Sequence, residues 1–204
     1  MMNLSCRRRI LKIRRKVITS KYRVPHFKEL RSPMKLFAFY IGGETANSLI
    51  EVHDVRFAAA EKIEDAYEGI RASWWGTPES LHLDCWGELT SADGHNITLK
   101  TAPQTREDKL WFVNLGGYDP ANFGELHRDV FVVAPTQSKA KVKALKGILD
   151  WKGHHKDNVF DVEGITSIDD ILAKSGYYVH LEKTDTPVPF VFGYGFNPDI
   201  RKQA

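Results

Sequence analysis

The order of apolar and polar residues from Met34 onwards predicts short strands and helices. Residues 36–41, LFAFYI, are almost wholly apolar and end at Gly42-Gly43, which is typical of a strand covered on both faces. Further strands are expected over 55–60 and, after the turn Ala92-Asp93-Gly94, over 96–101. Between 61 and 75 an amphipathic helix is expected, with one stripe formed by Ile63, Ala66, Tyr67, Ile70 and Trp74.

A strictly alternating segment over 81–89 predicts one more strand in this half of the chain. Its expected apolar face carries Leu81, Leu83 and Cys85, and its other face carries His82, Asp84, Trp86 and Glu88. The alternation places Cys85 away from the neighbouring His82 and Asp84. A buried free cysteine usually acts as a small apolar residue, so we expect Cys85 to be structural rather than a nucleophile.

The second half of the chain repeats this order of elements. A strand over 110–115 ends at Gly116-Gly117, a strand follows over 129–134, and a helix is expected from Thr136, as N-cap, to Asp150. Its inner stripe is Val142, Leu145 and Leu149. Then come a strand over 159–165, a short helix over 167–176 capped by Ser167, a strand over 177–183 and an aromatic tail over 187–197 that we expect to pack over the body.

Residues 36–60 align without a gap on residues 110–134, and seven of the 25 pairs are identical. About one or two identities are expected for unrelated segments, so the alignment indicates an internal duplication. The predicted fold class is α+β: two tandem β-β-α-β-β repeats, 34–108 and 109–204, packed as one pseudo-symmetric body with helices against a mostly antiparallel or mixed sheet.

Basic residues are concentrated at the start of the chain. Residues 1–33 carry eleven basic side chains and one acidic side chain, for a charge of +10, and the rest of the chain carries −7. The basic segment is interpreted as a disordered arm or the product of a misassigned start codon; an RNA- or membrane-surface-binding arm and an organelle-targeting segment are the alternatives. Two cysteines, Cys6 and Cys85, form no disulfide framework, and no apolar run is long enough to span a bilayer. A cytoplasmic protein is expected.

Five separated motifs follow one another in the first half of the chain: Tyr40-Ile-Gly42-Gly43, Glu51-Val-His53-Asp54-Val-Arg-Phe57, Ile63-Glu64-Asp65-Ala-Tyr67, Trp75-Gly76 and Leu81-His82-Leu-Asp84. Together they resemble a bacterial family, the domain of unknown function numbered 1543. The resemblance covers Met34 to Glu88 and, more weakly, the second copy through Asp161 and Glu163. It implies small bacterial proteins with this duplicated arrangement and brings no assigned activity. Tyr118 and Arg128 replace Glu44 and Asp54 in the second copy, which indicates that the copies have diverged in role.

The Glu-x-His motif is the main candidate for chemistry, because it occurs in both copies as Glu51/His53 and Glu125/His127. On a strand, positions i and i+2 share a face, so each copy presents a carboxylate beside an imidazole. If the copies pack about a pseudo-twofold axis, the four side chains converge on a ligand set suited to Zn, Mn or Fe. In the structural alternative, each Glu accepts N–H bonds from its glycine loop and each His donates to a backbone carbonyl.

The two Gly-Gly pairs, Gly42-Gly43 and Gly116-Gly117, are interpreted as turns that need a positive φ. Phosphate binding by their N–H groups is the alternative, but neither a following Lys-Ser/Thr nor a G-x-G-x-x-G pattern supports it.

A lysine-rich segment over 138–157 is the candidate for nucleic-acid contacts, through Lys139, Lys143, Lys146 and Trp151. At helical pitch these lysines face away from the apolar stripe, so a solvated face is the plainer interpretation. His154-His155 adds only a weak metal signal. The aromatic residues are expected in the core, with a pocket as the alternative: Trp74, Trp75, Trp86, Trp111, Phe190, Phe192, Tyr194 and Phe196.

Three functions are compatible with these features. The preferred one is a binding or accessory protein with its site between the two repeats. The second is a metal-dependent enzyme that uses Glu51, His53, Glu125 and His127, with a divalent metal as its cofactor. The third is an RNA-associated protein that uses the basic arm and the lysine-rich helix. The residues themselves specify no ligand, partner or oligomeric state.

Overall fold

The computed structural model of the chain describes residues 33–118, 121, 123–147 and 161–202. The chain separates into two compact units, 1–31 and 32–204, and every element described here belongs to the second. The expected basic arm, residues 1–33, therefore lies almost wholly outside the described residues. Within the described residues, no helix is both long and apolar enough to cross a membrane.

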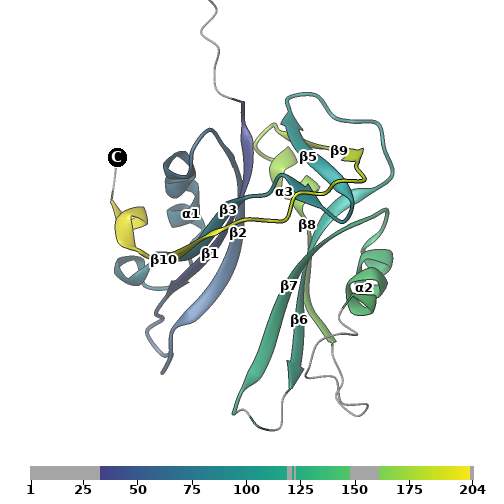
Figure 1. Cartoon of the computed structure of the whole chain (residues 1–204). Helices are drawn as coiled ribbons and strands as arrows, with labels where there is room; N and C mark the ends of the chain where they lie inside the picture. The colour runs from purple at the N-terminus through teal and green to yellow at the C-terminus, as the bar shows by residue number, and fades with distance from the viewer. Residues whose placement is uncertain (1–32, 119–120, 122, 148–160, 203–204) are drawn as a thin grey trace, which may run out of the picture. The chain divides into compact units, whose positions relative to one another are not determined.

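The second unit is α+β, with mostly antiparallel sheets and few helices, which confirms the predicted fold class at this level (Figure 1). The strands are β1 (Lys35–Gly43), β2 (Val52–Ala60), β3 (His82–Glu88), β4 (Ser91–Ala92), β5 (His95–Lys100), β6 (Lys109–Tyr118), β7 (Glu125–Ala134), β8 (Asp161–Ser167), β9 (Tyr178–Lys183) and β10 (Gly193–Asn197). The α-helices are α1 (Tyr67–Ser73), α2 (Gln137–Lys146) and α3 (Ile168–Ala173), and short 3-10 helices are η1 (Ile63–Ala66), η2 (Pro78–Ser80) and η3 (Pro198–Arg201).

Two of the sheets are built around equivalent antiparallel hairpins. β1 lies between β2 and β3 in a sheet of order β10-β3-β1-β2, and β6 lies between β7 and β8 in a sheet of order β7-β6-β8. Gly42 stands opposite His53 in the first hairpin, and Gly116 stands opposite His127 in the second. The two hairpins therefore have the same register, displaced by the 74 residues that separate the aligned segments. The expected last strands of the two halves, β5 and β9, pair with each other in a third sheet with β4.

A β-bulge interrupts the third strand of each of these sheets. Tyr40 pairs with Cys85 and the next residue of β1 pairs with Leu83, so Asp84 has no partner of its own. In the other sheet the same shift leaves Glu163 as the extra residue of β8. An extra residue reverses the alternation of faces beyond it. The expectation that Leu83 and Cys85 lie on the same face of β3 is therefore wrong. Cys85 lies on the same face of the sheet as Tyr40, its partner on β1.

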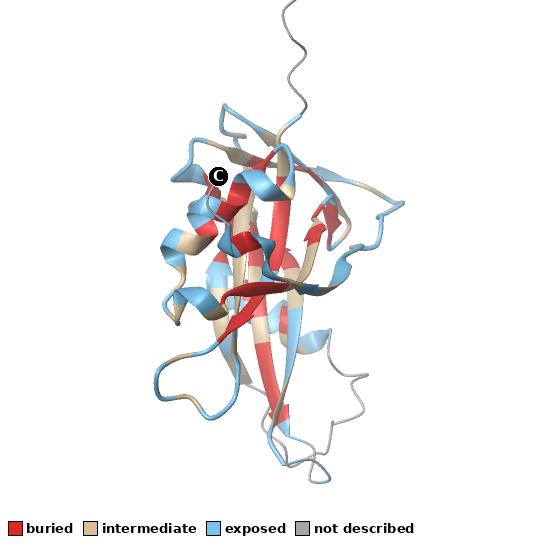
Figure 2. Ribbon diagram, turned by 90° about the vertical axis from the view of Figure 1, so that its left-hand side faces the viewer, coloured by how far each residue is buried: buried red, intermediate tan, exposed pale blue. Residues whose placement is uncertain are grey.

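Phe57 of β2 and Phe112 of β6 bring the two hairpin sheets face to face, with ring centroids 5.4 Å apart. We call the facing surfaces the inner faces. A shared core joins them at one end; it contains Leu36, Leu89, Ala92, Ile97, Leu110, Val133, Ile168, Leu172, Val179 and Leu181. Two further cores lie on the outer faces, under η1 and α1 in one sheet and under α2 in the other. Figure 2 shows these buried residues along the strands and on the covered sides of the helices.

The helices follow the predicted positions with one error of orientation. The segment expected as one helix over 61–75 is η1 followed by α1, with Ala66, Tyr67 and Ile70 buried as predicted. Thr136 caps α2 as predicted, by accepting a hydrogen bond from the backbone N–H of Lys139. Of the expected inner stripe of α2, Leu145 packs against the core as predicted, whereas Val142 is 53% exposed, and Ala140 and Ala144 are the buried residues.

The aromatic tail forms an unexpected fourth strand. β10 pairs antiparallel with β3, so a segment at the end of the second half completes the sheet of the first half. Most of its large side chains stay exposed, including Tyr194 and Phe196, while Phe190 packs against the shared core. The tail therefore covers the body as expected, but through backbone pairing that its Gly-rich sequence, Gly193-Tyr-Gly-Phe, does not reveal.

Candidate functional site

The Gly-Gly pairs are strand residues, so the expected positive-φ turns are wrong. Gly42 and Gly43 belong to β1, and Gly116 and Gly117 belong to β6. The positive-φ glycines of the described residues lie elsewhere, at Gly94, Gly124, Gly176 and Gly195.

Close approach of polar side chains explains the first glycine of each pair. A Cβ atom on Gly42 would lie 2.7 Å from Asp84 Oδ2, 2.9 Å from His82 Nε2 and 3.0 Å from Glu51 Oε1. A Cβ atom on Gly116 would lie 2.7 Å from Glu125 Oε1 and would also overlap the Glu163 carboxylate. Each glycine is thus the floor of a polar cluster on the inner face of its sheet.

The first of these, the Glu51 cluster, consists of Glu51, His53, His82 and Asp84. His82 Nε2 lies 2.8 Å from Glu51 Oε1 and 3.3 Å from Asp84 Oδ1. His53 Nε2 lies 3.5 Å from Asp84 Oδ2 and 3.7 Å from Glu51 Oε2. Two imidazole nitrogens and two carboxylates therefore meet in one place.

His82 is the buried member of this cluster, with 5% of its surface exposed. Its Nδ1 atom lies 2.8 Å from the Ser80 carbonyl, which fixes the orientation of the ring. The ring of Phe196, from β10, covers it at a centroid distance of 4.5 Å. The tail strand thus helps to shield the cluster from water.

The second, the Glu125 cluster, consists of Glu125, His127 and Glu163. His127 Nδ1 lies 3.1 Å from Glu163 Oε2, and one ligand atom from each of the three residues lies within 4.8 Å of the other two. Glu125 also raises the pKa of the Tyr118 hydroxyl, first through its negative charge and then through a hydrogen bond. All three members are more open to solvent than His82.

The clusters occupy equivalent places in their sheets. Asp84 and Glu163 are the bulge residues, and His82 and Asp161 stand opposite Gly42 and Gly116 respectively. The structure therefore brings together each predicted Glu-x-His pair with partners that the sequence reasoning missed: His82, Asp84 and Glu163. Two features of the sequence relate to these partners: the repeated glycine and an acidic residue in the third strand of each sheet. They do not identify the clusters by themselves, because a β-bulge has no reliable sequence pattern.

Both predicted histidines face a common space between the sheets. A cleft of about 850 Å³ runs between the inner faces and is lined by His53 and His127. Asp54, Arg56, Asp129 and Glu163 add charges to this polar cleft. The two histidines thus share a cleft, while each belongs to its own cluster.

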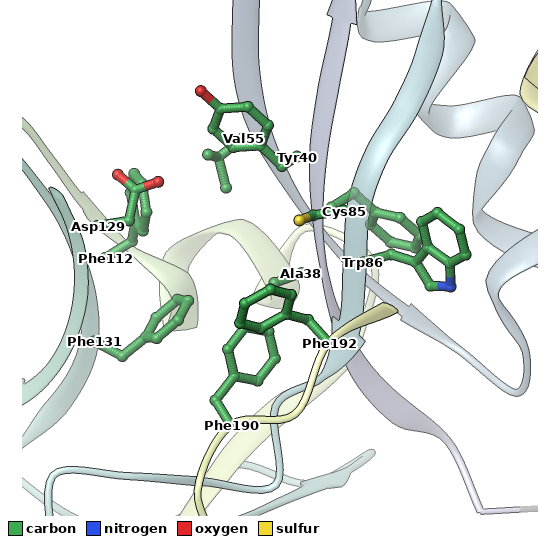
Figure 3. Close-up of a pocket in the computed structure, with 11 residues that line it drawn as sticks. Ala38, Tyr40, Val55, Cys85, Trp86, Phe112, Asp129, Phe131, Phe190 and Phe192 are labelled. Carbon is green, nitrogen blue, oxygen red and sulfur yellow. The ribbon is translucent and has the colours of Figure 1, made fainter. Parts of the chain in front are cut away.

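A smaller aromatic pocket of about 240 Å³ adjoins the polar cleft and shares Tyr40, Val55, Phe112 and Asp129 with it. Figure 3 shows Asp129 and Phe131 on one side of this pocket and Cys85 on the other, with its sulfur pointing inwards. The complete lining is Ala38, Phe39, Tyr40, Val55, Cys85, Trp86, Phe112, Asp129, Phe131, Phe190 and Phe192.

Desolvation by the surrounding residues is the main cause of the raised pKa values in this pocket. It raises the pKa of the Asp129 carboxyl, although this residue is exposed on β7 and Asn114 Nδ2 donates a hydrogen bond of 2.8 Å to Asp129 Oδ1. Burial also raises the pKa of Tyr40 and of the Cys85 thiol, and the negative charge of Asp84 adds to both shifts. A raised thiol pKa disfavours the thiolate.

The expectation that the other aromatic residues lie in the core is met at Trp111 and is wrong at Trp75, Tyr194 and Phe196, which are exposed. Trp111 is buried and donates from Nε1 to the Ala134 carbonyl at 2.8 Å. Trp74 and Trp75 lie against each other after α1, at a centroid distance of 5.2 Å. Only part of the predicted aromatic set, Trp86 with Phe190 and Phe192, therefore reaches the pocket.

The lysine-rich segment is only partly described. Lys139 and Lys146 are exposed on α2, whereas the Lys143 ammonium pairs with Asp93 and donates to the Val133 carbonyl at 3.1 Å. Lys143 thus ties α2 to the β4–β5 turn. Trp151 lies outside the described residues, as do Leu149, Lys152, His154, His155 and Lys156.

Comparison with known proteins places this architecture in a family. The sequence model of a Domain of Unknown Function (DUF1543) matches residues 48–99, which include Glu51, His53, His82 and Asp84. The chain is also similar to the crystal structure of a protein Il1583 from Idiomarina loihiensis, with 32% identity, a TM-score of 0.61, and coverage of 80% of this chain and 96% of that chain. No curated protein matches. The chain therefore belongs to the DUF1543 family.

Proposed function

We propose that the chain is a binding protein that holds a small organic cation in the aromatic pocket of the cleft between its two hairpin sheets. The observation that carries this proposal is the lining of the pocket: Asp129 is its one charged residue among rings from β6, β7, β3 and the tail. An aromatic wall with a single carboxylate attracts a positive charge on an apolar body.

The electrostatics of Asp129 support the same ligand class. Within the described residues, none of the ion pairs involves Asp129. Partial desolvation raises the pKa of its carboxyl, which means a modest cost for the bare carboxylate, because the residue stays exposed on β7. A bound cation would offset this cost, and the phenyl rings of Phe131 and Phe190 would face it with their negative surfaces.

The arrangement of the two halves supports a site between them. We infer that 34–108 and 109–204 are tandem repeats, because their hairpins share one register and their bulges fall at equivalent positions. Packing of two such units leaves both inner faces turned towards one cleft, which is a common location for a ligand.

Calorimetric titration with phenyltrimethylammonium tests this function. We expect the full chain to bind this cation at least about tenfold more tightly than its neutral isostere tert-butylbenzene, a difference of about 1.4 kcal/mol. Asp129→Asn should remove most of that preference. Asp185→Asn, which changes an exposed loop aspartate, should leave it unchanged.

The pH dependence gives a second readout of the same experiment. Asp129 must be ionised to attract the cation, and its pKa is raised by burial. The affinity for phenyltrimethylammonium should therefore rise as the pH rises through this pKa, and the rise should be absent in Asp129→Asn. Equal affinities for the cation and the isostere at every pH would contradict the proposal.

A metal-dependent enzyme is the second candidate. The observation that favours it is the mutual approach of Glu125, His127 and Glu163 within 4.8 Å at the edge of the polar cleft. A metal held there could polarise a substrate bound in the cleft. The third candidate, an RNA-associated protein, stays a prediction: Lys139, Lys143 and Lys146 are exposed, but the Lys143 ammonium pairs with Asp93 and Trp151 lies outside the described residues.

A further inference from the structure

We propose that Glu51, His53, His82 and Asp84 form a binding site for one divalent transition-metal ion, with both imidazole Nε2 atoms and both carboxylates as ligands. This site goes beyond the cation pocket and does not depend on it, because it involves neither Asp129 nor the aromatic lining.

The four side chains form a closed ring of contacts. His82 Nε2 lies 2.8 Å from Glu51 Oε1 and 3.3 Å from Asp84 Oδ1, and His53 Nε2 lies 3.7 Å from Glu51 Oε2 and 3.5 Å from Asp84 Oδ2. Each carboxylate therefore directs one oxygen to each imidazole. Ligands of a tetrahedral ion lie roughly 3.3–3.6 Å from one another, so one oxygen of each carboxylate would turn towards the ion when it binds.

The hydrogen-bond capacity of His82 points to a cation at its Nε2 atom. A neutral imidazole carries one N–H, and Nδ1 uses it to donate to the Ser80 carbonyl. Nε2 then presents a lone pair to the carboxylates of Glu51 and Asp84, which is a repulsive arrangement. A metal ion between these atoms removes the repulsion, and the Nδ1–H···O=C bond is the usual support of a metal-bound histidine. A second proton on His82 would also remove it, and the experiment below separates the two.

Asp84 supplies an independent indication. Its Oδ2 atom is buried and has no hydrogen-bond partner among the described residues. An unsatisfied buried carboxylate oxygen is costly, because it has lost water without gaining a donor. It lies over Gly42 and faces His53 Nε2, so an ion coordinated by His53 would satisfy it.

The donor set selects the class of metal. Two imidazole nitrogens with two carboxylates suit Zn²⁺, Mn²⁺ or Fe²⁺, whereas Ca²⁺ prefers oxygen ligands alone. Two carboxylates also balance the charge of a divalent ion. The Glu125 cluster brings one ligand atom from each of its three residues within 4.8 Å of the others, but it offers only one histidine and none of its members is buried as His82 is.

Zinc binding by the full chain, stripped of metal with a chelator, is the test. We expect one tight equivalent of Zn²⁺ by calorimetry and elemental analysis. Glu51→Gln and Asp84→Asn, which keep the side-chain shapes, should each weaken it at least tenfold. His95→Gln is the matched control, because His95 also approaches a backbone carbonyl through Nδ1, at 2.9 Å, but lies in an exposed hairpin. It should bind zinc like the unaltered chain.

A spectroscopic measurement guards against variants that fail to fold. Co²⁺ bound by the unaltered chain should show the intense visible absorption of a four-coordinate ion, and Glu51→Gln should change it. The proposal is overturned if the unaltered chain binds no zinc. It is also overturned if Glu125→Gln, and neither Glu51→Gln nor Asp84→Asn, removes the tight equivalent. Retention of zinc in Asp129→Asn separates this site from the cation pocket.

Discussion

Replacement of Leu110 by alanine is expected to lower the free energy of unfolding by about 2–5 kcal/mol, the usual cost of a cavity at a fully buried leucine. Leu110 of β6 is 0% exposed and belongs to the shared core, with Leu36 of β1 and Val179 of β9. Because this core joins the two hairpin sheets, both should lose stability together. Urea unfolding followed by tryptophan fluorescence and by far-UV circular dichroism measures the change.

Leu49→Ala is the control for this experiment. Leu49 is 101% exposed, so its truncation should change the free energy of unfolding by no more than about 0.5 kcal/mol. If Leu110→Ala behaved like this control, or if the two signals showed separate transitions in the unaltered chain, the two sheets would not share a core. The cleft between their inner faces would then lose its structural basis.

Gly42→Ala is expected to destabilise the fold by about 1–3 kcal/mol, as overpacking does elsewhere. The added methyl group would lie within 3.0 Å of atoms of Asp84, His82 and Glu51, and His82 is buried and cannot move aside freely. Thermal unfolding measures the loss of stability. The same substitution should weaken zinc binding at the Glu51 cluster, because the methyl group occupies the space that the ligands share.

Gly69→Ala provides the matched substitution. A Cβ atom on Gly69 meets nothing within 4 Å, and this glycine lies inside α1. Alanine should therefore stabilise the helix by about 0.5–1 kcal/mol. Should Gly42→Ala prove as stable as Gly69→Ala, the polar cluster would have room to spare and the explanation for the repeated glycine would be wrong.

The hydrophobic pattern was sufficient to predict most elements. The runs that became β1 and β6, the capped helices α2 and α3, and the β4–β5 turn all depend on neighbouring residues and local backbone preferences. At that turn Asp93 and Gly94 both have positive φ, at 50° and 73°, as the sequence Ala-Asp-Gly predicts. Local chemistry decides such features, so one sequence contains enough information for them.

Features that depend on distant partners could not be predicted. The bulge at Asp84 moves Cys85 to the inner face, and it arises from pairing with β1 rather than from the local alternation. On α2, the apolar pattern predicts that Val142 faces the sheet, but Ala140 and Ala144 are the buried residues. In the same way, β10 depends on backbone pairing with the edge of β3, which lies far from it in the sequence.

Only part of the candidate site could be predicted from the sequence. The alignment of residues 36–60 on 110–134 identified Glu51, His53, Glu125 and His127, because both segments contain them. It could not identify His82, Asp84 or Glu163, since those residues reach the clusters only through the third strand of each sheet. The sequence interpretation of the repeated glycine as a turn with positive φ is wrong. The clusters require a residue without a side chain at this position, because a Cβ atom would overlap their polar groups.

A chemical-shift map tests the inter-sheet cleft as the binding site most directly. Amide spectra of the full chain would be recorded during titration with phenyltrimethylammonium. We expect the largest amide chemical-shift changes on the inner faces, at Tyr40, Val55, Phe112 and Asp129. These four residues line both the aromatic pocket and the polar cleft. The largest shifts on the outer helices α1 and α2, or no localised shifts at saturating ligand, would contradict it.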